Sequence, residues 1–238
     1  MSPIPIGAGS SDEEIREVVT SWALENVPAS WQTAAREGGR ERIRDVRNFE
    51  EYEAWYPIFA ESGLVAATWP VRYGGLELSV RQTEIAYECF EPYNLGRLNI
   101  IGLSAISPAL FAFGSEEQRL RFLPPMVRNE ERWSQLLSEP GAGSDLASLS
   151  TRAERDGDVW VITGQKVWST WAHRADYANC LARTDPSVAK RNGLTYFLLD
   201  LRSPGVTVRP LTQISGDSDF SEVFLDEVRV PDSNRVGP

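Results

Sequence analysis

Residues 158–170, DVWVITGQKVWST, mark the change of pattern that decides the fold. This stretch is rich in β-branched and aromatic residues, and Thr163-Gly164 has the composition of a hairpin turn, so we expect two short strands here. Before about residue 130, apolar residues recur at helical spacing instead. The sequence therefore predicts an α+β protein with a disordered leader (1–10), a helical domain (11–130) and a small antiparallel β domain (131–238).

Start and stop signals place the helices. Ser11 with Glu14, and Ser115 with Gln118, have the spacing of capping boxes. We expect helices from residue 11, over 40–61, 79–91 and 99–113, and from 115 to Pro124-Pro125. In the second half we expect further strands over 177–184, 195–201 and 221–230.

Composition narrows the class of protein. The chain of 238 residues is 42% hydrophobic and 24% charged, as in an ordinary soluble globular protein. Its formal net charge of -10 argues against a nucleic-acid partner, which requires a basic surface. No apolar run approaches the ~20 residues of a membrane span, and the first residues resemble neither a signal nor a transit peptide. We expect a cytoplasmic protein without membrane insertion.

Cysteine and histidine are scarce. Cys89 and Cys180 lie far apart and form no CxxC motif, so we expect two buried thiols rather than a disulfide or a zinc site. The only histidine, His173, leaves no basis for a His-based metal site. We therefore expect no metal.

The loop LLSEPGAGSD, residues 136–145, follows an apolar run and carries two glycines. It begins like a dinucleotide fingerprint, but Leu146 occupies the position of the third glycine, and no P-loop GK[ST] follows. No GxSxG motif supports a serine hydrolase. Glu139 and Asp145 form a possible acid–base pair, although loop carboxylates more often brace backbone N–H groups. The glycines allow the backbone to approach a flat ligand closely.

The segment WSTW, residues 168–171, offers two indoles around two hydroxyls. An indole face can cover an aromatic cofactor, and an adjacent hydroxyl can donate to a ring nitrogen. The alternative is that both tryptophans belong to the core, as strand tryptophans usually do.

Taken together, five stretches resemble the acyl-CoA dehydrogenase family. They are residues 133–148 (WSQLLSEPGAGSDLAS), 157–184, 63–79 (GLVAATWPVRYGGLELS), 114–135 and 220–237 (FSEVFLDEVRVPDSNRVG). The resemblance implies a helical N-terminal domain followed by an antiparallel β-barrel-like domain. It also implies an FAD-dependent oxidoreductase of fatty acid and lipid metabolism that introduces a 2,3 double bond into an acyl-CoA thioester. Such an enzyme would pass electrons to an electron-transfer flavoprotein and form a homo- or hetero-oligomer.

The resemblance also implies roles for loop residues. Gln135, Leu137 and Ser138 would line the isoalloxazine and upper ribityl of FAD. Gly143 and Ser144 would lie where flavin and thioester meet, with Ser144 also binding substrate. Glu139 and Asp145 would brace the loop.

Three strand residues receive roles from the same resemblance. Trp168 would cover the flavin ring, Thr170 would donate a hydrogen bond near N5, and Ser169 would supply a backbone contact. A non-catalytic scaffold has no reason to keep these residues together with Gln135 and Ser138.

The family pattern includes a C-terminal helical bundle that carries the general base, and the sequence stops at NRVGP. We therefore expect the catalytic base beyond residue 238, weak FAD binding and no turnover by these residues alone. A fragment is favoured over a natural partial subunit completed by another chain. A non-catalytic partner subunit and an acyl-CoA oxidase are the alternatives.

Overall fold

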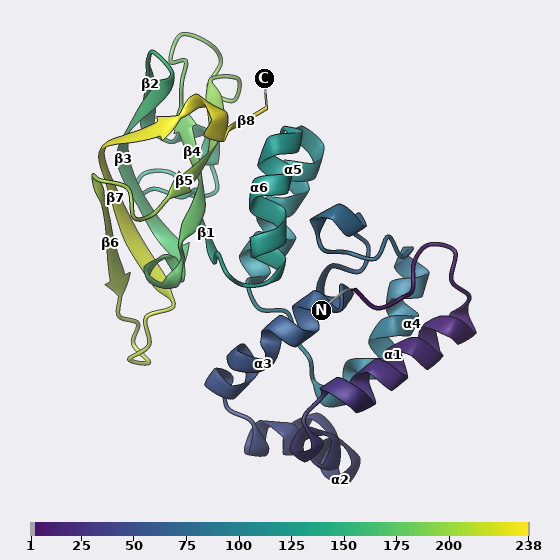
Figure 1. Ribbon diagram of the computed structural model, residues 1–238. Helices are drawn as coiled ribbons and strands as arrows, with labels where there is room; N and C mark the ends of the chain where they lie inside the picture. Colours follow the sequence, from purple (N-terminus) through teal and green to yellow (C-terminus); the bar gives the residue numbers. More distant parts are fainter. Residues whose placement is uncertain (1–2, 238) are drawn as a thin grey trace. The chain divides into compact units, whose positions relative to one another are not determined.

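The computed structural model describes residues 3–237 (Figure 1). The chain forms two compact units, one of residues up to Leu98 with Leu123–Glu130, the other of Asn99–Phe122 with the residues from Glu131 onward. Helices give way to strands after residue 130, but Asn99–Phe122 groups with the strands. Among the described residues no helix is long and apolar enough to cross a membrane.

The first unit contains four α-helices and three short 3₁₀ turns. The helices are α1 (Asp12–Asn26), α2 (Ala29–Val46), α3 (Phe49–Glu61) and α4 (Val80–Phe90), and the turns are Leu64–Ala66, Val71–Tyr73 and Glu91–Tyr93.

Polar caps explain where these helices begin. The Ser11 hydroxyl accepts from the Glu14 N–H at 3.2 Å at the start of α1. Asn48 and Glu51 form a full capping box at the start of α3. The predicted single helix over 40–61 is therefore wrong, because Asn48 begins a new helix and α2 already starts at Ala29.

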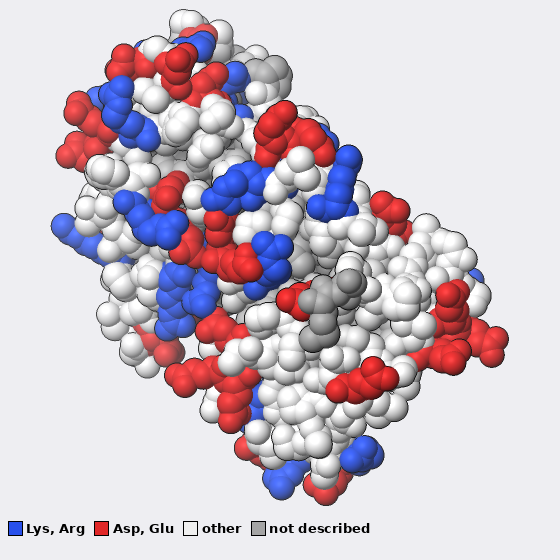
Figure 2. Space-filling view, in the orientation of Figure 1, with Lys and Arg blue, Asp and Glu red and all other residues white. Residues whose placement is uncertain are grey.

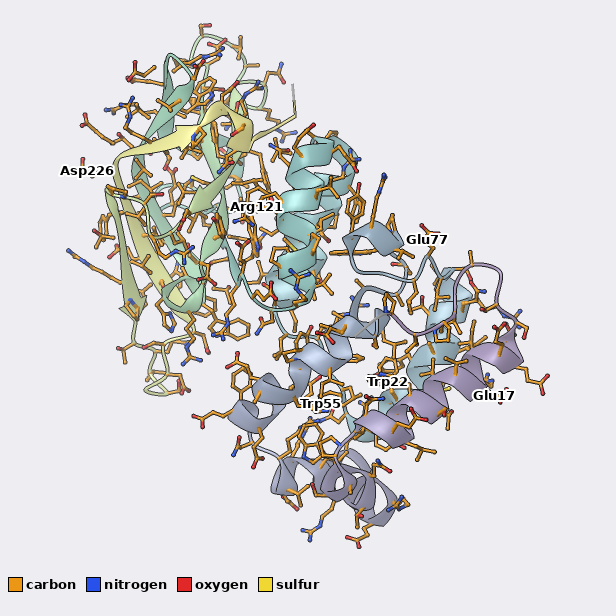
Figure 3. The ribbon with its side chains drawn as sticks, viewed as in Figure 1. Glu17, Trp22, Trp55, Glu77, Arg121 and Asp226 are labelled. Carbon is orange, nitrogen blue, oxygen red and sulfur yellow. The ribbon has the colours of Figure 1, made fainter. Side chains whose placement is uncertain are left out.

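The core of this unit is aromatic. Trp22 and Trp55, labelled in Figure 3, have ring centroids 6.3 Å apart, and Trp31 meets Trp55 edge-on at 5.3 Å. Edge and tilted contacts of this kind add to the stabilisation from apolar burial. Phe49 is 61% exposed at the start of α3 and lies outside this core.

Residues 3–10 are packed rather than disordered. Ile4 and Ile6 are buried, and the Ile4 N–H donates to the Ser62 carbonyl at 3.1 Å. This differs from the expected disordered leader, of which residues 1 and 2 lie outside the described residues.

The predicted helix over 99–113 consists of a π-helical turn, Gly102–Ile106, followed by α5 (Ser107–Phe113). The next helix, α6, spans Glu116–Val127. Its predicted capping box is confirmed, because the Gln118 N–H donates to Ser115 Oγ at 3.2 Å and Gln118 Oε1 accepts from the Ser115 N–H at 3.0 Å. The two prolines do not end α6, which continues to Val127.

The second unit is built on one open sheet. Its strands are β1 (Trp133–Leu136), β2 (Arg152–Asp156), β3 (Val159–Thr170), β4 (Tyr177–Arg183), β5 (Leu194–Asp200), β6 (Val206–Leu211), β7 (Phe220–Pro231) and β8 (Arg235–Val236). The order is β6-β7-β3-β2-β4-β5-β8, with β1 paired to β4. The predicted α+β class is confirmed. The sheet is not closed as a barrel, and the β1–β4 and β2–β4 pairs are parallel.

One long strand, β3, replaces the predicted hairpin at Thr163-Gly164. The tight turn lies earlier, at Gly157-Asp158 between β2 and β3, where Gly157 has a φ of +62°. Gly164 instead permits a close approach, since a Cβ there would lie 2.7 Å from the Cα of Thr151. The thiols also differ from expectation in part: Cys180 is buried, but Cys89 is only half-buried, and both are free.

Candidate functional site

The two segments singled out in the sequence, 136–145 and 168–171, lie on adjoining stretches of the second unit. The Val167 N–H donates to the Ser138 carbonyl at 2.9 Å. Ser134, which lies on β1 four residues before Ser138, donates its hydroxyl hydrogen to the Thr170 carbonyl at 2.7 Å. The end of β3 therefore runs alongside β1 and the loop that follows it.

The residues of these segments differ in exposure. Trp168 is 62% exposed and Ser169 is buried. A further four candidates are half-buried: Gln135, Leu137, Ser138 and Thr170. The structure thus brings six of the eight candidates onto adjoining stretches of backbone.

Gly143 and Ser144, the other two candidates, are exposed and lie farther along the loop. They follow a tight turn in which the Glu139 N–H donates to the Ala142 carbonyl at 2.9 Å and the Ala142 N–H donates back at 3.1 Å.

Trp168 has a strained backbone. Its φ is +60°, in the left-handed region that a bulky side chain rarely adopts. The strand pairing shifts register between Lys166 and Ser169, which places Trp168 in a β-bulge. Bulges redirect a side chain, and strain of this kind concentrates at ligand sites.

Trp171 has a second positive φ, of +50°. Its N–H donates to the Asp219 carbonyl at 2.7 Å, and its indole Nε1–H donates to the Asp219 carboxylate at 3.1 Å. These two bonds hold a 43% exposed indole in a fixed orientation. Neither tryptophan is a core residue, so the alternative interpretation of this segment is wrong.

Glu139 braces the loop, as expected. Its carboxylate accepts from the Ser150 N–H at 2.6 Å, the Ser150 hydroxyl at 2.7 Å and the Thr151 N–H at 2.9 Å. Burial raises the pKa of this carboxyl, but the donors outweigh burial and bring the pKa to about 2. A carboxylate that is saturated and this acidic cannot serve as a general base near neutral pH.

Asp145 has a different environment. It is exposed, and its carboxylate accepts from Lys190 Nζ and from the Ser148 hydroxyl, both at 2.5 Å. The hydrogen bond from Lys190 lowers the pKa of Asp145. This pair ties the loop to the segment between β4 and β5.

The sequence interpretation missed Lys166. Its side chain is fully buried, and its Nζ lies 2.9 Å from Glu139 Oε1. The strand period contained the signal, because Lys166 shares a face with the buried residue Ile162, four positions earlier.

The buried polar atoms that have no hydrogen-bond partner among the described residues include Trp133 Nε1 on β1, Ser169 Oγ and Asn179 Oδ1. Asn179 is the register partner of Gln135 across the β1–β4 pair. Buried polar atoms are satisfied in most proteins, so each unsatisfied one calls for an explanation.

His173 does not assemble a hydrolase triad with the loop serines. Its Nδ1 lies 3.1 Å from the Ser221 hydroxyl, and burial lowers the pKa of the imidazole. Within residues 3–237 no group of three or more His, Cys, Asp or Glu is placed to hold a metal ion.

These features fit a flat heteroaromatic ring. The exposed residue Trp168 offers an aromatic face, and two half-buried residues with hydroxyl groups, Ser138 and Thr170, lie on the two adjoining backbones. A flavin requires this combination of an apolar face and edge donors.

Comparison with known proteins gives the same family over both units. Residues 10–130 match the family model described as acyl-CoA dehydrogenase, N-terminal domain, and residues 134–228 match acyl-CoA dehydrogenase, middle domain. The acyl-CoA dehydrogenase IpdE1 of Mycobacterium tuberculosis is 41% identical over 226 residues, which cover 94% of this chain and 58% of IpdE1. The acyl-CoA dehydrogenase FadE34 of the same organism is 48% identical over 182 residues, 75% of this chain and 25% of FadE34.

Among solved structures, the ChsE4–ChsE5 complex from Mycobacterium tuberculosis superimposes with a TM-score of 0.71 at 29% identity, covering 99% of this chain and 58% of that chain. The chain thus spans little more than half the length of IpdE1 and of the matched ChsE4–ChsE5 chain. The chain belongs to the acyl-CoA dehydrogenase family.

Proposed function

We propose that the strip formed by residues 135–138 and 168–170 is the ring-binding part of an FAD site, in an oxidoreductase that introduces a 2,3 double bond into an acyl-CoA thioester. The observation that carries this proposal is the strained, exposed Trp168 on a stretch of backbone that adjoins Ser138 and includes Thr170, both half-buried residues with hydroxyl groups. Membership in the family supports it.

Each residue then has a physical task. FAD, when bound, supplies the acceptor for a hydride from the carbon β to the thioester. Thr170 donates to the edge of the ring, and Trp168 covers a face of the ring and excludes water from it. Gln135, Leu137 and Ser138 line the ring and upper ribityl, and the Ser169 backbone contributes a contact.

Gly143 and Ser144 are proposed to contact the thioester where it meets the ring. Gly143 has no atom of another residue near the position of a Cβ, so its backbone is open to a ligand. Ser144 is exposed and offers a small hydroxyl donor to the same ligand.

The base that removes the α-proton is proposed to come from a segment or chain outside these residues. Glu139 is occupied by four donors, and Asp145 is exposed and paired with Lys190. We propose a cytoplasmic homo- or hetero-oligomer that passes electrons to an electron-transfer flavoprotein. The ChsE4–ChsE5 complex is an example of a two-protein assembly with this fold.

Titration with FAD tests the ring site. We expect weak, saturable binding to the isolated chain, detected as quenching of flavin fluorescence. Thr170→Val keeps the shape but removes the donor, and we expect about tenfold weaker binding. Thr163→Val, a half-buried threonine on the same strand, is the control and should bind as wild type. Equal affinities in all three proteins contradict the proposal.

The chemistry is tested by adding acyl-CoA to the FAD-loaded protein without oxygen, with and without candidate partner chains. We expect flavin reduction only when a second polypeptide completes the site. Reduction by the chain alone contradicts the assignment of the base to another segment. Rapid reoxidation of the reduced complex by dioxygen, rather than by an electron-transfer flavoprotein, identifies an oxidase.

A further inference from the structure

The buried ion pair of Lys166 and Glu139 takes no part in the roles described above. The two side chains are 0% and 3% exposed. Replacing a buried ion pair with apolar residues of similar volume is often neutral or stabilising, so net stability does not account for this pair.

The Lys166 ammonium joins three segments of chain. Its Nζ donates to the Leu181 carbonyl of β4 at 2.7 Å, to Glu139 Oε1 at 2.9 Å and to the Leu137 carbonyl at 3.1 Å. An ammonium group has three N–H donors, and all three have acceptors here. Leu137 and Glu139 flank Ser138, so the ammonium holds both neighbours of that residue.

Glu139 extends the connection to the start of β2 through its bonds from Ser150 and Thr151. On the other side of Ser138, the Val167 N–H donates to the Ser138 carbonyl at 2.9 Å. Val167 is the residue between Lys166 and Trp168. The pair and this bond therefore set the position of Ser138 relative to the bulge that carries Trp168.

We propose that Lys166 and Glu139 are positioning residues that hold the two edges of the ring site, Ser138 and Trp168, in their binding geometry before the flavin arrives. This inference rests on the proposed function. An apolar pair would fill the same volume, but it could not donate to the Leu137 carbonyl of the loop and the Leu181 carbonyl of β4, which tie the loop to the sheet.

The decisive variant is K166M/E139L, in which neither charge remains. Either single replacement leaves an unpaired buried charge and is expected to destabilise the protein, whereas the double replacement should return the thermal midpoint toward wild type. The control is R229M/D156L, which removes the exposed pair Arg229–Asp156, 2.7 Å apart, on the same sheet.

FAD is the probe, and two readouts are taken. We expect K166M/E139L to bind FAD at least about tenfold more weakly than wild type and to exchange the Val167 amide hydrogen faster. The control should bind FAD within roughly twofold of wild type. The comparison is between folded wild type and a folded double variant with a similar thermal midpoint. If Lys166 and Glu139 only stabilised the fold, FAD affinity would recover along with the thermal midpoint.

A folded K166M/E139L protein with wild-type FAD affinity and wild-type Val167 protection overturns the inference and leaves the proposed function intact. Wild-type chain that binds no FAD overturns the proposed function and the inference together. If the double variant does not fold, Glu139→Gln serves in its place. A folded Glu139→Gln protein is expected to show weaker FAD binding and faster Val167 exchange, and unchanged values of both overturn the inference.

Discussion

At residue 168 the chain holds an indole in a backbone conformation that asparagine adopts more readily. Because Trp168 is 62% exposed, its replacement removes little buried surface. We expect Trp168→Asn to raise the free energy of unfolding by about 1 kcal/mol and to weaken FAD binding. Trp171 also has a positive φ, and its replacement, Trp171→Asn, should leave FAD affinity closer to wild type. Denaturant unfolding and FAD titration of both variants check this, and Trp168→Asn with normal FAD affinity would be the contrary result.

Glu139 makes the free energy of unfolding depend on pH. Its folded pKa, about 2, is below the ordinary 4.5, so its contribution is complete above pH 4.5 and is lost as the pH falls from there toward 2. Glu139→Gln should therefore be less stable than wild type at neutral pH, and the gap should narrow over this window. Urea unfolding at pH 7, 4.5 and 3 measures the gap, and a gap independent of pH contradicts the account.

The sequence singled out Ser138, Trp168 and Thr170, but not the residues that support the segments on which they lie. Ser138, Trp168 and Thr170 stand in short recognisable motifs, and the structure places them on adjoining backbones. Lys166 escaped notice because a lysine in a strand is usually exposed, and only the long-range fold brings Glu139 and two carbonyls to it.

At the scale of an element, Gly164 shows that a short sequence pattern does not distinguish a turn from a close approach between two segments. It was expected to form a turn, but it allows β3 to pass close to Thr151. We expect Gly164→Ala to lower the free energy of unfolding by about 1–3 kcal/mol, because the added methyl overlaps the Thr151 backbone. Gly141→Ala adds its methyl in open space and should change stability by less than about 0.5 kcal/mol. Thermal unfolding compares the two, and similar small losses would contradict this explanation of Gly164.

The start of a helix could be predicted from the sequence where a capping box was recognised. The capping box at Ser115 and the strands near 177–184 and 195–201 were predicted from sequence. The break at Asn48 was missed because the apolar spacing continues across it, and the kink of α2 at Gly38-Gly39 lies outside the predicted helix. The parallel β1–β4 pairing joins residues more than 40 positions apart, which local pattern does not encode.

At the scale of the whole molecule, charge opposes the proposed ligand. The net charge is -10, and Figure 2 shows acidic side chains gathered over α1, where Figure 3 labels Glu17. FAD is also an anion, so screening the repulsion should strengthen its binding. We expect affinity to rise about two- to threefold between low salt and physiological ionic strength. Binding that weakens steeply with salt would instead indicate a cationic phosphate site within this chain.

The central claim is that residues 135–144 and 168–170 form one surface for a flavin ring. Backbone amide NMR of the chain during titration with FAD tests this claim most directly. We predict that the largest shift changes occur together in these two segments, with Thr170 among them, and saturate along one binding curve. Shift changes that occur elsewhere, with both segments unaffected at saturating FAD, would contradict the claim.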